Sequence, residues 1–102
     1  MNSAAISPDD AGSLTLAIDV AKAALAEVGE ERVELLTISD SGRVSISPAH
    51  LADGESIART LGLGSPRDHR MVEPGYTLWS GVRAGFEFEV RGTLRHTLGT
   101  WP

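Results

Sequence analysis

Apolar residues in the first third of the chain recur three or four positions apart, the spacing that places side chains on one face of a helix. They are Leu14, Ala17, Ile18, Ala21, Leu25 and Val28. Pro8 suits a first helical turn, Gly12 weakens that turn, and Gly29 provides a stop after the last apolar residue. We therefore expect a helix that begins near Pro8 or near Ser13 and stops at the glycine, preceded by a flexible tail of residues 1–6.

Two stretches with a period of two predict β-hairpins. Residues 32–39 are rich in β-branched and aliphatic side chains, and after a turn cluster at residues 40–42 the alternation continues over residues 43–47. Residues 76–80 are expected to form another strand, and residues 86–91 alternate apolar and charged side chains without a break. Strand-like segments separated by glycine-containing turns are typical of antiparallel pairs.

A second, shorter helix is expected between the two hairpins. Asp53 is a capping residue type, and the apolar face that follows it covers about two turns before glycines end it. Residues 64–75 hold two prolines and two glycines and show no period, so we expect a loop there. The predicted order is α-β-β-α-β-β. The fold class is α+β, a two-layer sandwich in which an antiparallel sheet of about four strands carries the helices on one face.

Length and composition indicate one globular domain, residues 1–102. The apolar fraction is 41% and the charged fraction 23%, close to the average of soluble domains. The chain has no cysteine, which excludes disulfides and thiolate zinc sites. No stretch reaches the roughly 20 apolar residues of a membrane span, and the N-terminus lacks the basic and apolar regions of a secretory signal. We therefore expect a cytoplasmic protein that does not enter the membrane.

The charge balance narrows the range of partners. The net charge is −5, which opposes binding to the phosphates of nucleic acids and to the anionic surface of a bilayer. We therefore expect nucleic acid to be disfavoured as a partner. A local basic patch could still overcome this balance, so a regulator that binds nucleic acid through its C-terminal hairpin stays an alternative.

The densest polar cluster of the sequence lies in the expected loop and consists of Arg67, Asp68, His69 and Arg70. Two arginines that flank an acid–histidine pair are suited to binding an anion. Alternatively, Asp68 could orient His69 as a general base, which would support a small-ligand binder or a hydrolase-like enzyme. A solvated loop without a ligand is the simplest interpretation.

Aromatic residues are the other candidates for partner contacts. Tyr76 and Trp79 lie on the second hairpin, and Trp101 lies next to the C-terminus. Exposed tyrosine and tryptophan often anchor interfaces. Tyr76 and Trp79, with Arg83 and Arg91, could also form a stripe for single-stranded nucleic acid, although acidic residues on the neighbouring strand oppose it.

The second half of the chain resembles a group of known sequences. A helix that ends in LGLG, a polar loop and the segment YTLWSGVRAGFEFEV follow one another. Residues 54–91 thereby resemble uncharacterised small α+β proteins of high-GC actinobacteria and their phages, in which a short helix often precedes a W-x-G hairpin. The resemblance implies an α+β fold and a cytoplasmic or phage-associated setting, and it carries over no catalytic residue.

The leading functional prediction is a small interaction module that associates with itself or with another protein. The first predicted strand is apolar on both faces, with Val33 and Leu35 on one and Leu36 and Ile38 on the other, so one face is left for a second copy. No catalytic, phosphate-binding or dinucleotide motif is present. We therefore expect no catalytic residue, no cofactor and no metal, and we favour binding over catalysis.

Overall fold

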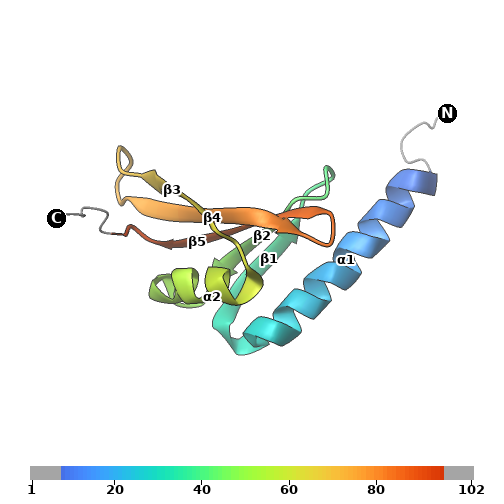
Figure 1. The fold of residues 1–102 in the computed structure, drawn as a ribbon, viewed down its shortest axis with the longest axis horizontal. Coiled ribbons are helices and arrows are strands. Elements are labelled where there is room, and N and C mark those ends of the chain that lie inside the picture. The colour runs from blue at the N-terminus through green and yellow to red at the C-terminus, as the bar shows by residue number, and fades with distance from the viewer. Residues whose placement is uncertain (1–7, 96–102) are drawn as a thin grey trace.

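The computed structural model of the chain describes residues 8–95, which form two α-helices and one five-stranded sheet (Figure 1). The elements in chain order are α1 (Pro8–Val28), β1 (Val33–Ile38), β2 (Val44–Pro48), α2 (Gly54–Leu61), β3 (Ser65–His69), β4 (Tyr76–Arg83) and β5 (Phe86–Thr93). Single turns of 3-10 helix, Glu30–Arg32 and Leu51–Asp53, precede β1 and α2. The expected tail of residues 1–6 and Trp101 lie outside the described residues.

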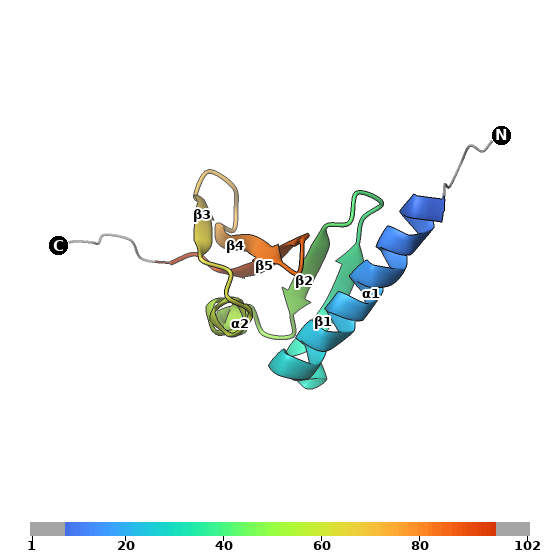
Figure 2. The ribbon, with the colours of Figure 1, turned by 45° about the vertical axis from the view of Figure 1, so that its right-hand side comes forward.

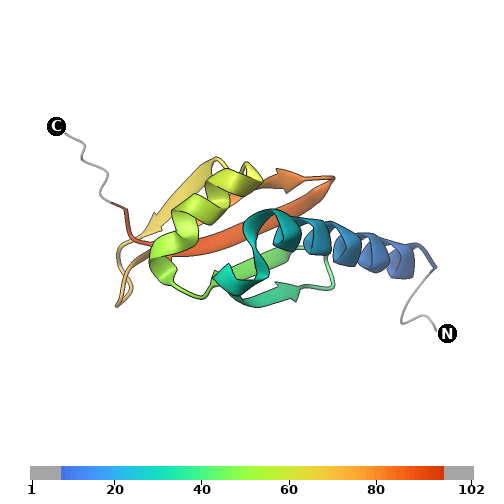
Figure 3. The ribbon, with the colours of Figure 1, turned by 90° about the horizontal axis from the view of Figure 1, so that it is seen from below.

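The α+β class is confirmed, but the predicted sheet is wrong in two respects. The strand order is β1-β2-β5-β4-β3, so there are five strands where about four were expected. β2 and β5 pair in parallel, whereas the other neighbouring strands pair antiparallel. Seen from below, both helices lie in front of the sheet (Figure 3). The other side of the sheet, called here the open face, is covered by no described helix.

The additional strand is β3, which occupies most of the predicted loop. Residues 65–69 pair with β4 in a regular antiparallel register from Ser65↔Ser80 to His69↔Tyr76, and only residues 70–75 connect the two strands. A proline is tolerated here because β3 is an edge strand, where one row of backbone groups needs no partner strand. An edge strand also needs few apolar side chains, so this segment lacks the alternation of apolar and polar residues that is typical of strands.

The core lies between the helices and the two central strands. β2 and β5 contribute Val44, Ile46, Phe88 and Val90, all of which are buried. Ile57, Ala58 and Leu61 of α2 pack against these side chains, as do Ala21, Ala24 and Val28 of α1. Asp53 stands before α2 as expected, but its side chain makes no capping hydrogen bond.

The sequence predicts apolar side chains on both faces of β1, but the structure leaves only one large apolar side chain of this strand exposed. The register between β1 and β2 shifts between Val33 and Leu35, which inserts one extra residue into β1. Such a bulge changes which face the following side chains occupy. Val33, Leu36 and Ile38 consequently all pack against the core, and Leu35 alone is left 55% exposed.

α1 extends past the end of the sheet. Its 21 residues span about 31 Å at the usual helical rise, and only its C-terminal part runs alongside β1 (Figures 1 and 2). The N-terminal part projects beyond the strands and carries three exposed large side chains, Leu14, Leu16 and Ile18. No helix in the described part of the chain combines the length and the apolar character that a membrane span requires.

Candidate functional site

The strand β3 separates the polar cluster that the sequence places together. Successive side chains of a strand point to opposite faces. Asp68 is paired in register with the fully buried Thr77 on the helix side of the sheet. Arg67 and His69 therefore lie on the open face, and the pair in which Asp68 orients His69 as a base is not assembled.

On the helix side, Asp68 is the centre of a structural network at the end of the sheet. Its Oδ1 accepts hydrogen bonds from Thr77 Oγ1 at 2.8 Å and from Arg95 Nε at 3.0 Å. Arg70 approaches the other carboxylate oxygen at 3.7 Å and donates to the backbone carbonyl of Arg95 at 3.1 Å. These contacts tie the segment after β5 to β3 and to the loop that follows it.

This network also changes the acidity of Asp68. Burial of the carboxyl group acts to raise its pKa, but the hydrogen bonds from Thr77 and Arg95 and the nearby positive charges outweigh that effect. The pKa of Asp68 consequently lies below the ordinary value of 3.8, and the group is ionised at neutral pH. A carboxylate held in this way fixes structure and is a poor proton acceptor.

On the open face, three side chains from three neighbouring strands form a stack. The rings of His69 and Tyr76 lie 4.5 Å apart with an interplanar angle of 18°. The guanidinium carbon of Arg91 lies 4.0 Å from the centre of the Tyr76 ring. The tyrosine ring is thus in contact with a neighbour on either strand beside it, and this stack holds the arginine side chain over β4.

A second row crosses the same strands beside this stack. Arg67 of β3 and Arg91 of β5 are both paired in register with Leu78 of β4, so the leucine lies between two arginines. We call Arg67, His69, Tyr76, Leu78 and Arg91 the open-face cluster. It brings together four of the residues that the sequence singles out, Arg67, His69, Tyr76 and Arg91, and it adds Leu78.

The ion pairing of the arginines distinguishes this cluster from the rest of the surface. Five arginines have a carboxylate within 4.0 Å: Arg43, Arg59, Arg70, Arg83 and Arg95. Arg32 donates a hydrogen bond to Ser56 at 3.1 Å. Within residues 8–95, Arg67 and Arg91 are the arginines whose guanidinium groups form neither an ion pair nor a hydrogen bond, and both lie on the open face.

Trp79, which the sequence proposes as an anchor, is not part of this surface. Trp79 is only 7% exposed and belongs to the core, with Arg95 over its ring at 5.7 Å. Trp101 lies outside the described residues. Arg83 is also engaged elsewhere, because it forms an ion pair with Glu27 of α1. The stripe of Tyr76, Trp79, Arg83 and Arg91 is therefore not assembled on one face.

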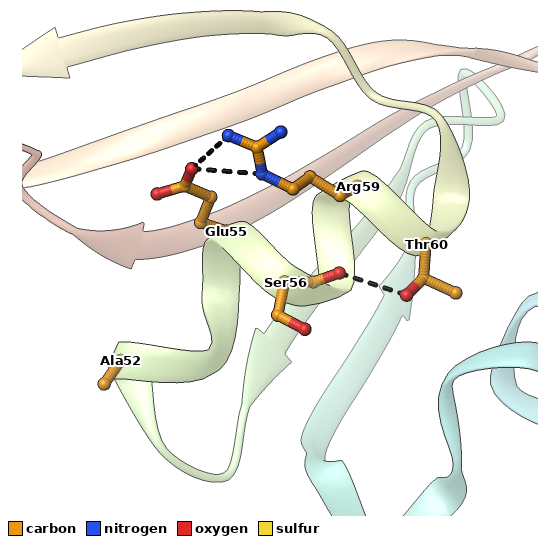
Figure 4. Close-up of a pocket in the computed structure, with 5 residues that line it drawn as sticks. All are labelled: Ala52, Glu55, Ser56, Arg59 and Thr60. Carbon is orange, nitrogen blue, oxygen red and sulfur yellow. Dashed lines mark hydrogen bonds and ion pairs between the residues drawn. The ribbon is translucent and has the colours of Figure 1, made fainter.

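A surface hollow lies on the outer side of α2 (Figure 4). Its lining side chains satisfy one another: Arg59 pairs with Glu55 at 2.6 Å, and the Thr60 hydroxyl donates to the Ser56 carbonyl at 3.1 Å. The hydroxyl of Ser56 accepts from Arg32 and has no base beside it. No group of three histidine or acidic side chains suited to hold a metal occurs among the described residues.

Comparison with known proteins adds no relative. No family model matches the chain, and searches of curated proteins and of solved structures find no match either. The resemblance of residues 54–91 to small actinobacterial and phage proteins stays a prediction from the sequence.

Proposed function

We propose that this protein is a small, cytoplasmic interaction module that associates with a second copy of itself through the N-terminal half of α1. One observation carries the proposal. The side of α1 that faces the sheet is made of alanines, with Ala17, Ala21 and Ala24 buried, whereas the larger Leu14, Leu16 and Ile18 are 46%, 58% and 40% exposed. A helix that packs only against the core of its own chain places its large apolar side chains toward that core.

The exposed side chains form two flanks of the alanine line. Leu14 and Ile18 are one turn apart on one flank, and Leu16 lies on the other. Both flanks are exposed and apolar, and the buried Ala17 lies between them. Burial of exposed apolar surface in an interface stabilises the complex by about 25 cal/mol for each Å² removed from water.

A second copy supplies a matching apolar surface. When two α1 helices pack antiparallel about a two-fold axis near Leu16, Leu14 of each copy approaches Ile18 of the other. In a dimer of this symmetry both copies use the same patch, so no unoccupied patch is left to which a further copy could bind.

The two alternative functions lack a comparable feature. A hydrolase-like enzyme needs a nucleophile beside a base. The alternation of β3 places Asp68 and His69 on opposite faces, and the hollow on α2 holds no such pair. A nucleic-acid regulator would need the arginines of the C-terminal hairpin together, and Arg83 is paired with Glu27.

The test is the solution mass by light scattering over a dilution series. We expect a species of twice 10.8 kDa for the natural chain and a shift to the single-chain mass for the double variant Leu16→Glu/Ile18→Glu. Glutamate is a good helix former, so α1 itself should persist. Ala26→Glu, at an exposed position of the same helix, is the matched control and should stay dimeric. A natural chain that is monomeric at every concentration, or a control that dissociates equally, contradicts the proposal.

A further inference from the structure

We propose that the open-face cluster binds an extended acidic segment of a protein partner. In this arrangement two carboxylates of the segment pair with Arg67 and Arg91, and an apolar side chain between them rests on Leu78. The cluster lies on a different surface from the exposed side chains of α1, so the inference does not depend on the proposed self-association.

The spacing of the row sets the pattern that fits it. Neighbouring strands lie about 4.8 Å apart, so the Cα atoms of Arg67 and Arg91 are roughly 10 Å apart with Leu78 midway. In an extended segment, alternate residues share one face and follow each other at about 6.7 Å. The pattern acid-x-apolar-x-acid therefore places both acids just outside the two arginines, within reach of their long side chains.

The stack prepares Arg91 for this role. A guanidinium that lies over an aromatic ring keeps the N–H groups on its edge free to meet a carboxylate. Arg91 rests on Tyr76, and Tyr76 is itself held by His69, so less side-chain freedom is lost when the arginine binds. Tyrosine and arginine beside an aliphatic side chain are also the residue types enriched at the centres of interfaces.

The acidic residues of this chain favour a different protein over a second copy as the partner. Two acids of β5 lie on the open face, and both are engaged within the chain. Glu87 pairs with Arg43 at 3.1 Å, and Glu89 accepts a hydrogen bond from the Ser45 hydroxyl at 2.8 Å. The chain also lacks the fitting pattern, because its acids four residues apart, Glu27/Glu31 and Glu30/Glu34, have Gly29 and Arg32 midway instead of an apolar side chain.

Two features disfavour single-stranded nucleic acid as the occupant. Bases bind such surfaces by stacking on aromatic rings. The Tyr76 ring already has His69 and Arg91 against it, so it is not free for a base. The net charge of −5 also repels a chain with one charge at every phosphate more than it repels a segment with two acids.

Fluorescence anisotropy of labelled peptides tests the inference. The probe carries the sequence Glu-Ser-Leu-Ser-Glu between Gly-Ser flanks, and the control probe has Gln in place of both Glu residues. We expect the acidic probe to bind with a Kd below about 1 mM, which is the range of weak recognition of short segments. The Gln probe should bind at least about fivefold more weakly, and added salt should weaken only the acidic one.

Three variants assign the binding to the cluster. Arg67→Gln and Arg91→Gln should each weaken binding of the acidic probe about fivefold, as expected for an exposed charge pair. Arg59→Gln, which removes an exposed arginine from α2, is the matched control and should bind normally. Circular dichroism melts establish that all three variants fold, and the Leu16→Glu/Ile18→Glu variant should retain binding because α1 is not involved.

Several outcomes would overturn the inference. Equal binding of the Gln probe, or an equal loss with Arg59→Gln, would show that Arg67 and Arg91 do not recognise carboxylates. Tighter binding of a fifteen-residue oligothymidine than of the acidic peptide would assign the open face to nucleic acid. Absence of saturable binding of the acidic probe at millimolar protein would leave the cluster without its proposed partner.

Discussion

The contact between α2 and β5 provides the sharpest test of the packing, through the substitution Gly54→Ala. Gly54 has φ −57° and ψ −45°, a conformation that alanine adopts without strain. Because alanine is favoured over glycine in a helix by about 1 kcal/mol, helix propensity alone would make this variant more stable. The packing of Gly54 predicts the opposite sign.

The magnitude follows from the distances at this position. A Cβ atom on Gly54 would lie 2.4 Å from the Cα of Gly92 and 2.5 Å from the carbonyl oxygen of Arg91. Both are backbone atoms, so no side chain can rotate away and α2 must move from the sheet by about 1 Å. Overpacking of this kind costs about 1–3 kcal/mol, and we take the upper value because backbone is displaced. After the gain in propensity of about 1 kcal/mol, the free energy of unfolding should fall by about 2 kcal/mol.

Thermal unfolding followed by circular dichroism measures this effect. For a domain of this size, 2 kcal/mol corresponds to a decrease in Tm of about 8–16 °C. Gly64→Ala is the matched control, because no atom lies within 4 Å of its Cβ position and its backbone is not left-handed. We expect the control to keep or slightly raise the Tm. If Gly54→Ala is as stable as the natural protein, the close approach of α2 to β5 is wrong.

Two further substitutions have defined expectations. In the turn between β4 and β5, Ala84 has φ 50° and Gly85 has φ 84°. Asparagine tolerates such a left-handed conformation better than alanine, so Ala84→Asn should raise the free energy of unfolding by about 0.5–1 kcal/mol. Thermal melting measures this change, and a lower Tm would contradict the expectation. The lowered pKa of Asp68 means that its ionised form stabilises the folded state above the ordinary pKa of 3.8, and that this contribution is lost as the pH falls through the lower folded value. Asp68→Asn should therefore be less stable than the natural protein at pH 7 in urea unfolding, with a difference that shrinks in acid, whereas a constant difference would refute the assignment.

The sequence predicts the locally determined elements well. The predicted helix, expected to begin near Pro8 or near Ser13 and to stop at Gly29, corresponds to α1, which begins at Pro8, and both hairpins appear near their expected positions. These elements depend on side-chain periodicity and on turn residues close in sequence.

Elements that depend on distant neighbours are not predicted. β3 lacks an apolar period because an edge strand with polar side chains needs none, and the parallel pairing of β2 with β5 is invisible in either strand alone. The open-face cluster shows the same limit. Arg91 meets Tyr76 only through the register of β4 with β5, and Asp68 and His69 are separated because they are neighbours in a strand.

The parallel pairing of β2 with β5 has a consequence for how the chain folds. Each half of the sheet is local in sequence, since β1 and β2 form a hairpin and β3 to β5 form a meander. The two halves meet only where Val44 to Ile46 pair with Phe88 to Val90. Hairpins close short loops quickly, whereas this junction joins segments separated by more than forty residues and carries the larger entropic cost. We therefore expect folding to become cooperative when this junction forms, and its central amides to be among the last to exchange with solvent.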